Sequence, residues 1–260
     1  MRWLILVILV VFVAVGVTAA AQRRGSFGGS TIEEYTPDGS ENQPYDGAFQ
    51  FVRTRYAYAF MGGGGRGSLA PWAHDHPRAD IHYMKILSEL TLLRPRVTGS
   101  NVFALDEPEL FKFPVSYMSE PGFWRPSESE VQGLRAYLLK GGFLIFDDFR
   151  GADWYNLQNQ MRRVLPECEF QELNGTHPVF HSFFEIPDPL VLDPPYGNLP
   201  PSYWGVFEQN DRGKRLMAIA NVNNDMGEYW EFSDTGYMPV DLSNQAYKFG
   251  VNYVLYAMTH

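Results

Sequence analysis

The chain has 260 residues, of which 45% are hydrophobic and 20% charged, a composition typical of a folded globular protein. This composition excludes a disordered chain, a collagen-like fibre and a protein that crosses a membrane many times. The 21 Lys and Arg against 30 Asp and Glu give a formal net charge of -9 without a basic cluster, so we expect no nucleic-acid partner.

Residues 1–21 have the features of an export signal. Arg2 precedes an apolar run from Trp3 to Val17, and an A-x-A cleavage site ends at Ala21. Two outcomes remain open: cleavage after Ala21, or retention of residues 3–21 as an inner-membrane anchor, because this stretch is just long enough to span a bilayer. In both cases we expect the remainder to be exported, to the periplasm or the extracellular space.

The chain then divides into a linker and one domain. Residues 22–47 are rich in Gly, Ser, Pro and acidic side chains without hydrophobic periodicity, which predicts a flexible linker. Residues 48–260 carry the periodic segments and predict a single domain. In the first half of the domain we expect a strand at 49–56, a glycine-rich loop at 61–67, a helix at 80–93 capped by Asp80, a strand at 111–118 and a helix from Ser127 to Gly141. In the second half we expect a strand at 143–146, a helix at 153–164, strands at 203–207 and 215–221, and a helix at 244–258.

The central elements carry the clearest signals. Ser127 and Glu130 form a capping box, and Gly141 and Gly142 end the helix that it opens. The continuous apolar run 143–146 is typical of a strand buried on both faces. Helices between apolar strands predict a three-layer α/β domain, with a mostly parallel sheet and helices on both faces.

Acidic and aromatic residues follow the predicted strands, where α/β sheets bind ligands. Asp147 and Asp148 come directly after the buried strand and can ligate a hard cation or act as acid and base; alternatively, one caps the next helix and the other is solvated. Candidate ligand-binding residues at the same edge are Arg55, Tyr56, Tyr117, Ser119 and Glu120.

Weaker motifs accompany this edge. His74 and His76 flank Asp75 with a spacing that allows a metal site but matches no named signature. His177 can serve as a general base, although no G-x-S-x-G motif supplies a nucleophile. The segment 223–231 reads as a polar turn with aromatic anchors or, alternatively, as a calcium loop or a saccharide platform. Residues 62–67 formally satisfy the G-x-G-x-x-G pattern, but no helix follows directly, so we expect a loop there.

Several blocks together resemble a bacterial domain-of-unknown-function family, number 4159, over residues 48–260. They are 51–56 with Arg53, Trp72, Asp75 to Pro77, Asp80, 117–118, 134–138, 141–144, 147–149, 177–180 and 256–260. The resemblance implies a flavodoxin-like or class I glutamine-amidotransferase-like fold, found in exported bacterial proteins, and no established activity. It adds Arg53, Asp75 and Asp80 to the ligand-binding candidates. In the family that the chain resembles, aromatic or other residues often occupy the positions of His74 and His76, which weakens the resemblance as support for a metal site there.

The amidotransferase nucleophile is a cysteine at a strand-to-helix turn, whereas the one cysteine here, Cys168, falls beyond a helix. We therefore expect a non-catalytic binding or assembly module of the cell envelope. Its partner would be an envelope protein, a saccharide or a second copy of the chain. The alternative is a carboxylate- or metal-dependent hydrolase of a saccharide or peptide. We expect no organic cofactor, and a divalent cation is compatible with either function.

Overall fold

The computed structural model of this protein describes residues 38–58 and 70–260. The predicted signal segment, most of the predicted linker and the glycine-rich loop lie outside the described residues. No helix among the residues described combines the length and hydropathy needed to cross a membrane.

A seven-stranded, mostly parallel sheet forms the centre of the domain, in the order β2-β1-β3-β4-β7-β6-β5. The first five strands in this order run parallel to one another, and β6 pairs antiparallel with both of its neighbours. The strands are β1 (Val52–Arg55), β2 (Asn101–Ala104), β3 (Val115–Ser119), β4 (Phe143–Phe149), β5 (Gln171–Leu173), β6 (Ser202–Phe207) and β7 (Leu216–Val222).

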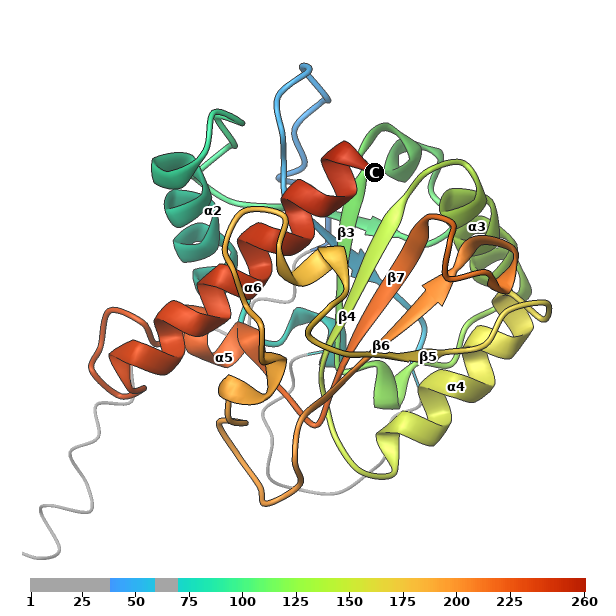
Figure 1. Ribbon diagram of the computed structural model, residues 1–260. Coiled ribbons are helices and arrows are strands. Elements are labelled where there is room, and N and C mark those ends of the chain that lie inside the picture. The colour runs from blue at the N-terminus through green and yellow to red at the C-terminus, as the bar shows by residue number, and fades with distance from the viewer. Residues whose placement is uncertain (1–37, 59–69) are drawn as a thin grey trace, which may run out of the picture. The chain divides into compact units, whose positions relative to one another are not determined.

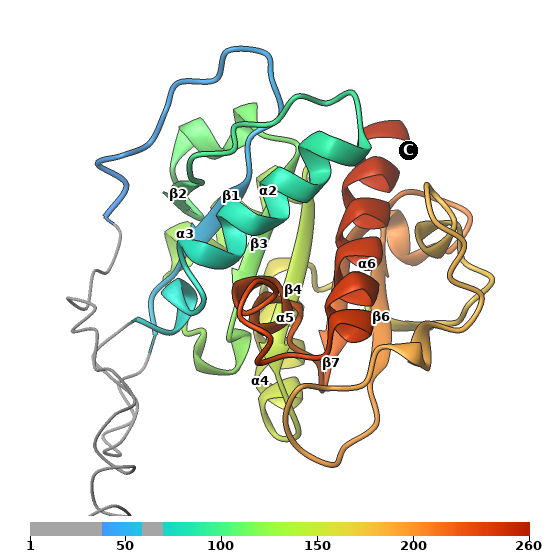
Figure 2. The ribbon, with the colours of Figure 1, turned by 90° about the vertical axis from the view of Figure 1, so that its left-hand side faces the viewer.

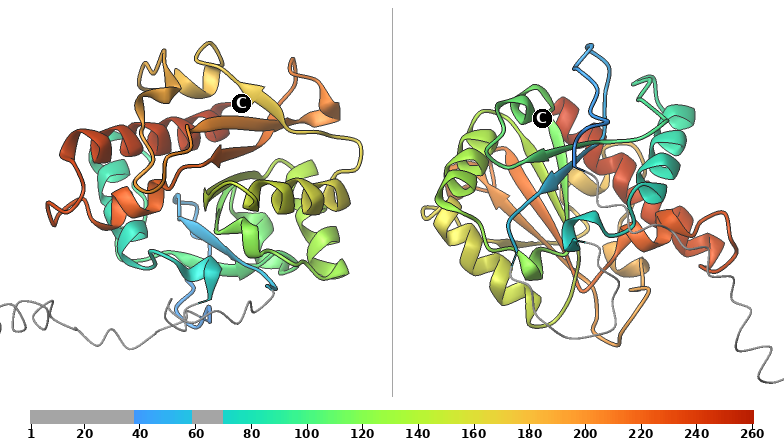
Figure 3. Two further views of the ribbon diagram at one scale, coloured as in Figure 1. Left: turned by 90° about the horizontal axis from the view of Figure 1, so that it is seen from below. Right: turned by 180° about the vertical axis from the view of Figure 1, so that it is seen from behind.

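Helices cover both faces of the sheet, which makes three layers (Figure 1). On one face lie α2 (Arg78–Leu90), α5 (Met226–Glu231) and α6 (Val240–Thr259), and Figure 2 shows this face. On the other lie α3 (Glu128–Leu139) and α4 (Asp153–Val164), as the further views in Figure 3 show. Alternation along β4 explains the two cores, because Phe143 and Ile145 point to one and Leu144 and Phe146 to the other. The predicted single α/β domain is confirmed.

The strongest local signals give the correct elements. The Ser127 hydroxyl accepts from the Glu130 N–H, and the Glu130 carboxylate accepts from the Ser127 N–H, so the capping box is formed. At the other end of α3, Gly141 has φ +111° and its N–H binds the Leu138 carbonyl, while the Gly142 N–H binds the Tyr137 carbonyl. This is a Schellman ending, in which glycine avoids the strain of the left-handed region.

Several boundaries differ from the prediction. The strand β4 continues through Asp147 and Asp148 to Phe149, so these two aspartates lie in the last residues of the strand rather than after it. Asp80 does not cap its helix: Pro77 precedes the first turn, and Asp80 lies inside α2. The helix also ends at Leu90 rather than Leu93. The predicted strand 111–118 begins only at Val115, since residues 108–112 form a 3-10 turn before Pro114. The strands β2 and β5 have no sequence prediction. The segment 223–231, read from the sequence as a polar turn, instead contains the short helix α5, most of whose residues are buried.

Candidate functional site

Asp147, at the carboxyl end of β4, fixes the start of α5. Its Oδ2 accepts hydrogen bonds from the N–H groups of Met226 (2.8 Å) and Gly227 (3.2 Å) and from the Tyr117 hydroxyl (2.8 Å). Its Oδ1 accepts from the Asn221 amide at 2.9 Å. Burial raises the pKa of Asp147, although these hydrogen bonds oppose the shift. The carboxylate thus accepts four hydrogen bonds, two of which come from the first N–H groups of α5.

Asp148, the next residue, contacts His74 and Ser119 instead of the partners of Asp147. Its backbone is left-handed, with φ +55°. Its Oδ2 lies 2.7 Å from His74 Nδ1 and 3.4 Å from Ser119 Oγ, which donates to it. Burial disfavours the imidazolium, but the hydrogen bond to Asp148 and the surrounding carboxylates outweigh it and raise the pKa of His74 to about 10. Burial likewise opposes ionisation of Asp148, yet His74 lowers the pKa of its carboxyl. The two groups form a charged pair.

Asp75 is the most unusual residue of the site. It is 5% exposed, has φ +63°, and neither carboxylate oxygen has a hydrogen-bond partner among the described residues. The ion pair recorded for Asp75 is with His74, whose Nδ1 lies 3.4 Å from Asp75 Oδ1, outside hydrogen-bond geometry, and the Arg53 charge also acts on the carboxylate. Burial and the charge of Asp148 raise the pKa of Asp75 well above its usual range, against the influence of His74. A buried carboxylate without donors is costly, and the cost is relieved by a proton or by a cation.

Asp225 brings a third buried carboxylate from the start of α5. Its Oδ1 caps the helix by accepting from the Glu228 N–H at 2.9 Å, while its Oδ2 is buried without a partner. Burial and the charges of three aspartates, Asp148 first, raise the pKa of Asp225 well above its usual range. The sequence analysis did not name Asp225 or Glu228 individually, although both lie in the segment 223–231, for which a calcium loop was the alternative to a polar turn. The signal was present, because Asp225-x-x-Glu228 is a helix-opening pattern like that of a capping box.

The three aspartates Asp75, Asp148 and Asp225 converge. Each offers an oxygen within 4.8 Å of those of the other two. Two further groupings include His74: one with Asp75 and Glu228, the other with Glu120 and Asp148. Ionised carboxylates only accept hydrogen bonds, so these oxygens can be joined only by protons or by a cation. Hard divalent cations are bound by such all-oxygen sets, at bond lengths of about 2.0–2.6 Å.

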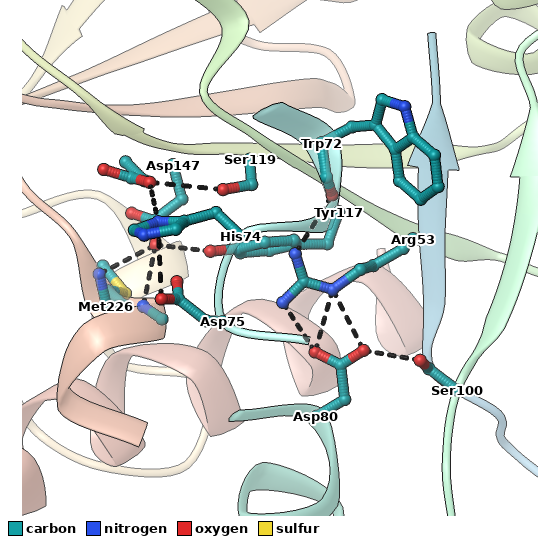
Figure 4. A network of polar contacts seen from close by, with 12 residues as sticks. Arg53, Trp72, His74, Asp75, Asp80, Ser100, Tyr117, Ser119, Asp147 and Met226 are labelled. Atoms are coloured by element: carbon teal, nitrogen blue, oxygen red, sulfur yellow. Dashed lines mark hydrogen bonds and ion pairs between the residues drawn. The ribbon is translucent and has the colours of Figure 1, made fainter. Parts of the chain in front are cut away.

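Arg53 and Asp80 pair with each other rather than with the aspartate cluster. Arg53 Nε and Nη2 contact the Asp80 carboxylate at 2.8–3.1 Å, and Ser100 donates to the same carboxylate at 2.5 Å. The Arg53 guanidinium also reaches the Trp72 carbonyl and lies over the Tyr117 ring (Figure 4). Both charges are fully buried and have partners, so their role here is to join β1 to α2 and to the segment that carries His74.

The other predicted residues are placed as follows. Tyr117 and Ser119 contact Asp147 and Asp148, and the Tyr56 hydroxyl donates to the carbonyls of Ser119 and Glu120. Arg55 instead pairs with Glu107 at 2.8 Å on the surface.

Two predicted histidines stay outside the cluster. His76 has a buried Nδ1 without a partner, and burial lowers its pKa to about 4; it belongs to none of the ligand groupings found among the described residues. His177 packs against Phe207, which pairs with Leu216 at the start of β7, so it lies at the opposite edge of the sheet from Asp148.

Two hollows on the surface differ in whether a clustered aspartate lines them. A small one of about 10 Å³ is lined by Arg150, Tyr196, Asn223 and Asp225 among others, and so lies next to Asp225. A larger one of about 110 Å³ is lined by residues of α4, Cys168 and Val206. The larger hollow contains none of the clustered carboxylates, so we base the site on the smaller one.

Fold and site together define a single-domain, three-layer α/β protein with buried aspartates at the carboxyl edge of its sheet. The family described as "Domain of unknown function (DUF4159)" matches residues 53–258, and the chain belongs to this family. The family resemblance stated from the sequence is thereby confirmed. A search of curated proteins finds no match to the chain.

Proposed function

We propose that this domain binds a divalent cation through Asp75, Asp148 and Asp225, and that it acts as a binding or assembly module of the cell envelope. The observation that carries the proposal is the Asp75 carboxylate, which is buried with both oxygens unpartnered and faces two other buried carboxylates. A cation offsets the mutual repulsion of the three aspartates and supplies the missing partners at once.

The surroundings favour a cation over a passive acidic pocket. His74 lowers the pKa of Asp148, which favours a negative ligand at neutral pH. Tyr117 and Asp147 hold the start of α5, so Asp225 is fixed relative to β4, which carries Asp148. Such preorganisation is what a metal site needs from its surroundings.

Binding is favoured over catalysis by the shape of the site. Asp75, Asp148 and Asp225 are each at most 5% exposed, and the adjoining hollow is smaller than the pockets of about 300–1,000 Å³ that enclose small-molecule substrates. Cys168 is buried, and burial raises its pKa, which is the reverse of what a nucleophile needs. These features support our proposal that the scaffold, flavodoxin-like or amidotransferase-like, does not carry out amidotransferase chemistry. The apolar segment at residues 3–21 supports an exported location, as a secreted or anchored protein.

A metal-dependent hydrolase of a saccharide or peptide is the second candidate, and one observation favours it. The His74 side chain is 34% exposed while its partner Asp148 is buried, so a protonated imidazole borders solvent beside the proposed cation. A group so placed can donate a proton to a leaving group. Hydrolysis of saccharide or peptide substrates that requires both the cation and His74 would support this candidate over the binding module.

The cation is tested by calorimetric titration of the purified full chain with Mg²⁺, Mn²⁺, Ca²⁺ and Zn²⁺ after EDTA treatment. We expect one of these ions to bind, and Asp225→Asn to weaken binding at least tenfold, because asparagine keeps the helix cap but removes the charge. Asp106→Asn is the matched control, since this exposed aspartate follows β2 at the same edge and lies outside the cluster. Absence of binding by all four ions, or equal binding by Asp225→Asn, contradicts the proposal.

A further inference from the structure

A third hollow lies at the opposite edge of the sheet from the aspartates, where β3 and β4 begin. It has a volume of about 280 Å³, close to the lower limit of about 300 Å³ for pockets that enclose small molecules. Pro114 and Gly142, which precede the two strands, belong to its lining. The exposed side chains that line it are aromatic or basic, namely those of Tyr45, Phe111, Lys112 and Lys140.

Tyr45 offers a fixed aromatic surface in this hollow. The residue is 46% exposed, and its ring packs edge-on against the buried ring of Phe113, with the two centroids 5.5 Å apart. The face of an aromatic ring is electron-rich and attracts the weakly positive C–H groups of a sugar ring. A half-exposed tyrosine whose ring is held by a neighbour is therefore suited to stack against a saccharide.

Phe111 holds the ammonium group of Lys140 at the same hollow. Lys140 Nζ lies 4.9 Å from the centroid of the Phe111 ring, and this ring packs edge-on against that of Tyr137. Lys112 adds a second ammonium group, whose Nζ lies 4.0 Å from a carboxylate oxygen of Glu109 on the exposed surface. A cation–π contact orients the Lys140 ammonium without neutralising it, so its charge stays available to an anion.

The charge of the hollow is opposite to that of the whole chain. The chain has a formal net charge of -9, yet two of its five lysines line this one hollow. None of the described residues that line it carries a carboxylate. An anionic ligand is thus attracted here although the protein as a whole repels it, and the hollow favours a ligand that joins an apolar face to a negative group.

The neighbouring backbone favours a saccharide over an acidic peptide. Peptides that bind beside a sheet usually add a strand to a free edge. Here β3 is paired with β1 and β4, and β4 is paired with β3 and β7, so neither strand offers a free edge at the hollow. A compact ring with a carboxylate matches the shape and the charge of the hollow without needing backbone hydrogen bonds.

We propose that this hollow binds an acidic saccharide, with one sugar ring stacked on Tyr45 and the sugar carboxylate on Lys140. Lys112 lies on the same hollow and attracts the remaining negative charge. The inference goes beyond the proposed function, because it needs neither the cation nor the three aspartates at the other end of the strands.

The experiment is calorimetric titration of the EDTA-treated full chain with trigalacturonic acid and with its methyl ester, which has the same rings without the charge. We expect the acid to bind about tenfold more tightly than the ester. Tyr45→Ala should weaken binding of the acid about tenfold, whereas Tyr45→Phe, which keeps the ring, should stay within about threefold of wild type. Lys140→Gln should weaken binding of the acid about fivefold and leave binding of the ester unchanged.

Tyr155→Ala and Lys248→Gln are the matched controls. Tyr155 is a more exposed tyrosine on α4, and Lys248 also lies over an aromatic ring, that of Phe184. Neither residue lines the hollow, so neither substitution should change the titration with the acid.

The outcomes are independent of the cation titrations. Absence of binding, or equal binding of the acid by wild type and Tyr45→Ala, overturns the inference and leaves the cation site intact. Equal affinity for the acid and its methyl ester also overturns it, because the ligand is then not recognised by its charge. Tighter binding of pentaglutamate would make the hollow a peptide site instead. Asp225→Asn should bind the acid as wild type does, and a loss of binding in this variant would place the saccharide at the aspartates.

Discussion

Two neighbouring aspartates at the end of β4 have different roles, and a substitution separates them. Asp147 accepts four hydrogen bonds and holds the start of α5, whereas Asp148 faces His74 and the aspartate cluster. Asp147→Asn replaces one accepting oxygen by an NH₂ group that faces N–H and O–H donors. We therefore expect the free energy of unfolding to fall by about 1–3 kcal/mol, both in EDTA and with a divalent cation present. Urea denaturation measures this loss, with Asp106→Asn, expected within about 0.5 kcal/mol of wild type, as the control. An unchanged stability would show that Asp147 is not a structural anchor.

His177 is expected to make the protein acid-sensitive. Burial, aided by the charge of Arg212, lowers the pKa of His177 to about 4, below its usual 6.5. The unfolded chain therefore binds a proton that the folded chain does not, and stability falls as the pH drops from about 6.5 to about 4. His177→Asn keeps an acceptor for the Val179 N–H and removes the titration. Its free energy of unfolding should decline less than that of wild type over this window.

The control for this prediction is His181→Asn. Hydrogen bonds to the Gly175 carbonyl and to Glu185 raise the pKa of His181, so its contribution to stability is present at low pH and is lost as the pH rises. Removing it cannot lessen the acid sensitivity. If His177→Asn and wild type decline in parallel, His177 does not titrate as its burial indicates.

Sequence reasoning placed part of the site and missed the rest for identifiable reasons. Asp147 and Asp148 follow a continuous apolar run, and the carboxyl end of a strand that begins with such a run is where ligands bind, so their location at that end was predictable. The pairing of Arg53 with Asp80 was not, because it joins residues 27 positions apart through the packing of α2 on β1. The absence of donors around Asp75 is likewise a property of the folded core that no local pattern records.

At the scale of elements, α5 depends on a glycine that brings it against Asp75. A Cβ added to Gly227 would overlap Asp75 Oδ2 and approach the Tyr117 hydroxyl at 3.0 Å. In an unconstrained helix, Gly→Ala is stabilising by about 1 kcal/mol. Here we expect Gly227→Ala to destabilise the protein and weaken cation binding, because the Asp75 carboxylate must move.

A double mutant tests this close approach. Asp75→Gly removes the carboxylate and tolerates the backbone φ of +63°. In that background Gly227→Ala should be neutral or stabilising, so the double mutant should lose less stability than the sum of the two single losses, a difference measurable by denaturation. Additive effects would show that Asp75 does not press against α5.

The helices whose bounds were predicted best are those that begin or end at a recognisable sequence signal. The bounds of α4 match the prediction, and the capping box and glycine pair define α3. The four-residue β2 and three-residue β5 form through pairing with β1 and β6, which local propensity does not reveal. In α5, six residues form a helix because Asp147 and Asp225 satisfy its first N–H groups from outside.

For the whole molecule, the three-layer architecture was predictable but the sheet is not parallel throughout. Only residues 208–215 separate β6 from β7, too few for a crossover helix, so the two strands form an antiparallel pair. That spacing was visible in the sequence. The order β2-β1-β3 was not, because β2 lacks a recognisable strand pattern.

The stability of the whole molecule provides the last prediction, which distinguishes a cation site from a structural one. Burial raises the pKa of Asp75 well above its usual range, so keeping its carboxylate inside the protein at neutral pH costs stability. In EDTA, Asp75→Asn should therefore be at least as stable as wild type. At a hundredfold excess of a bound cation over its dissociation constant, wild type should gain about 2.7 kcal/mol and the variant should not. Chemical denaturation with and without the cation should thus reverse the order of the two proteins. A variant that is less stable under both conditions would make Asp75 a structural residue.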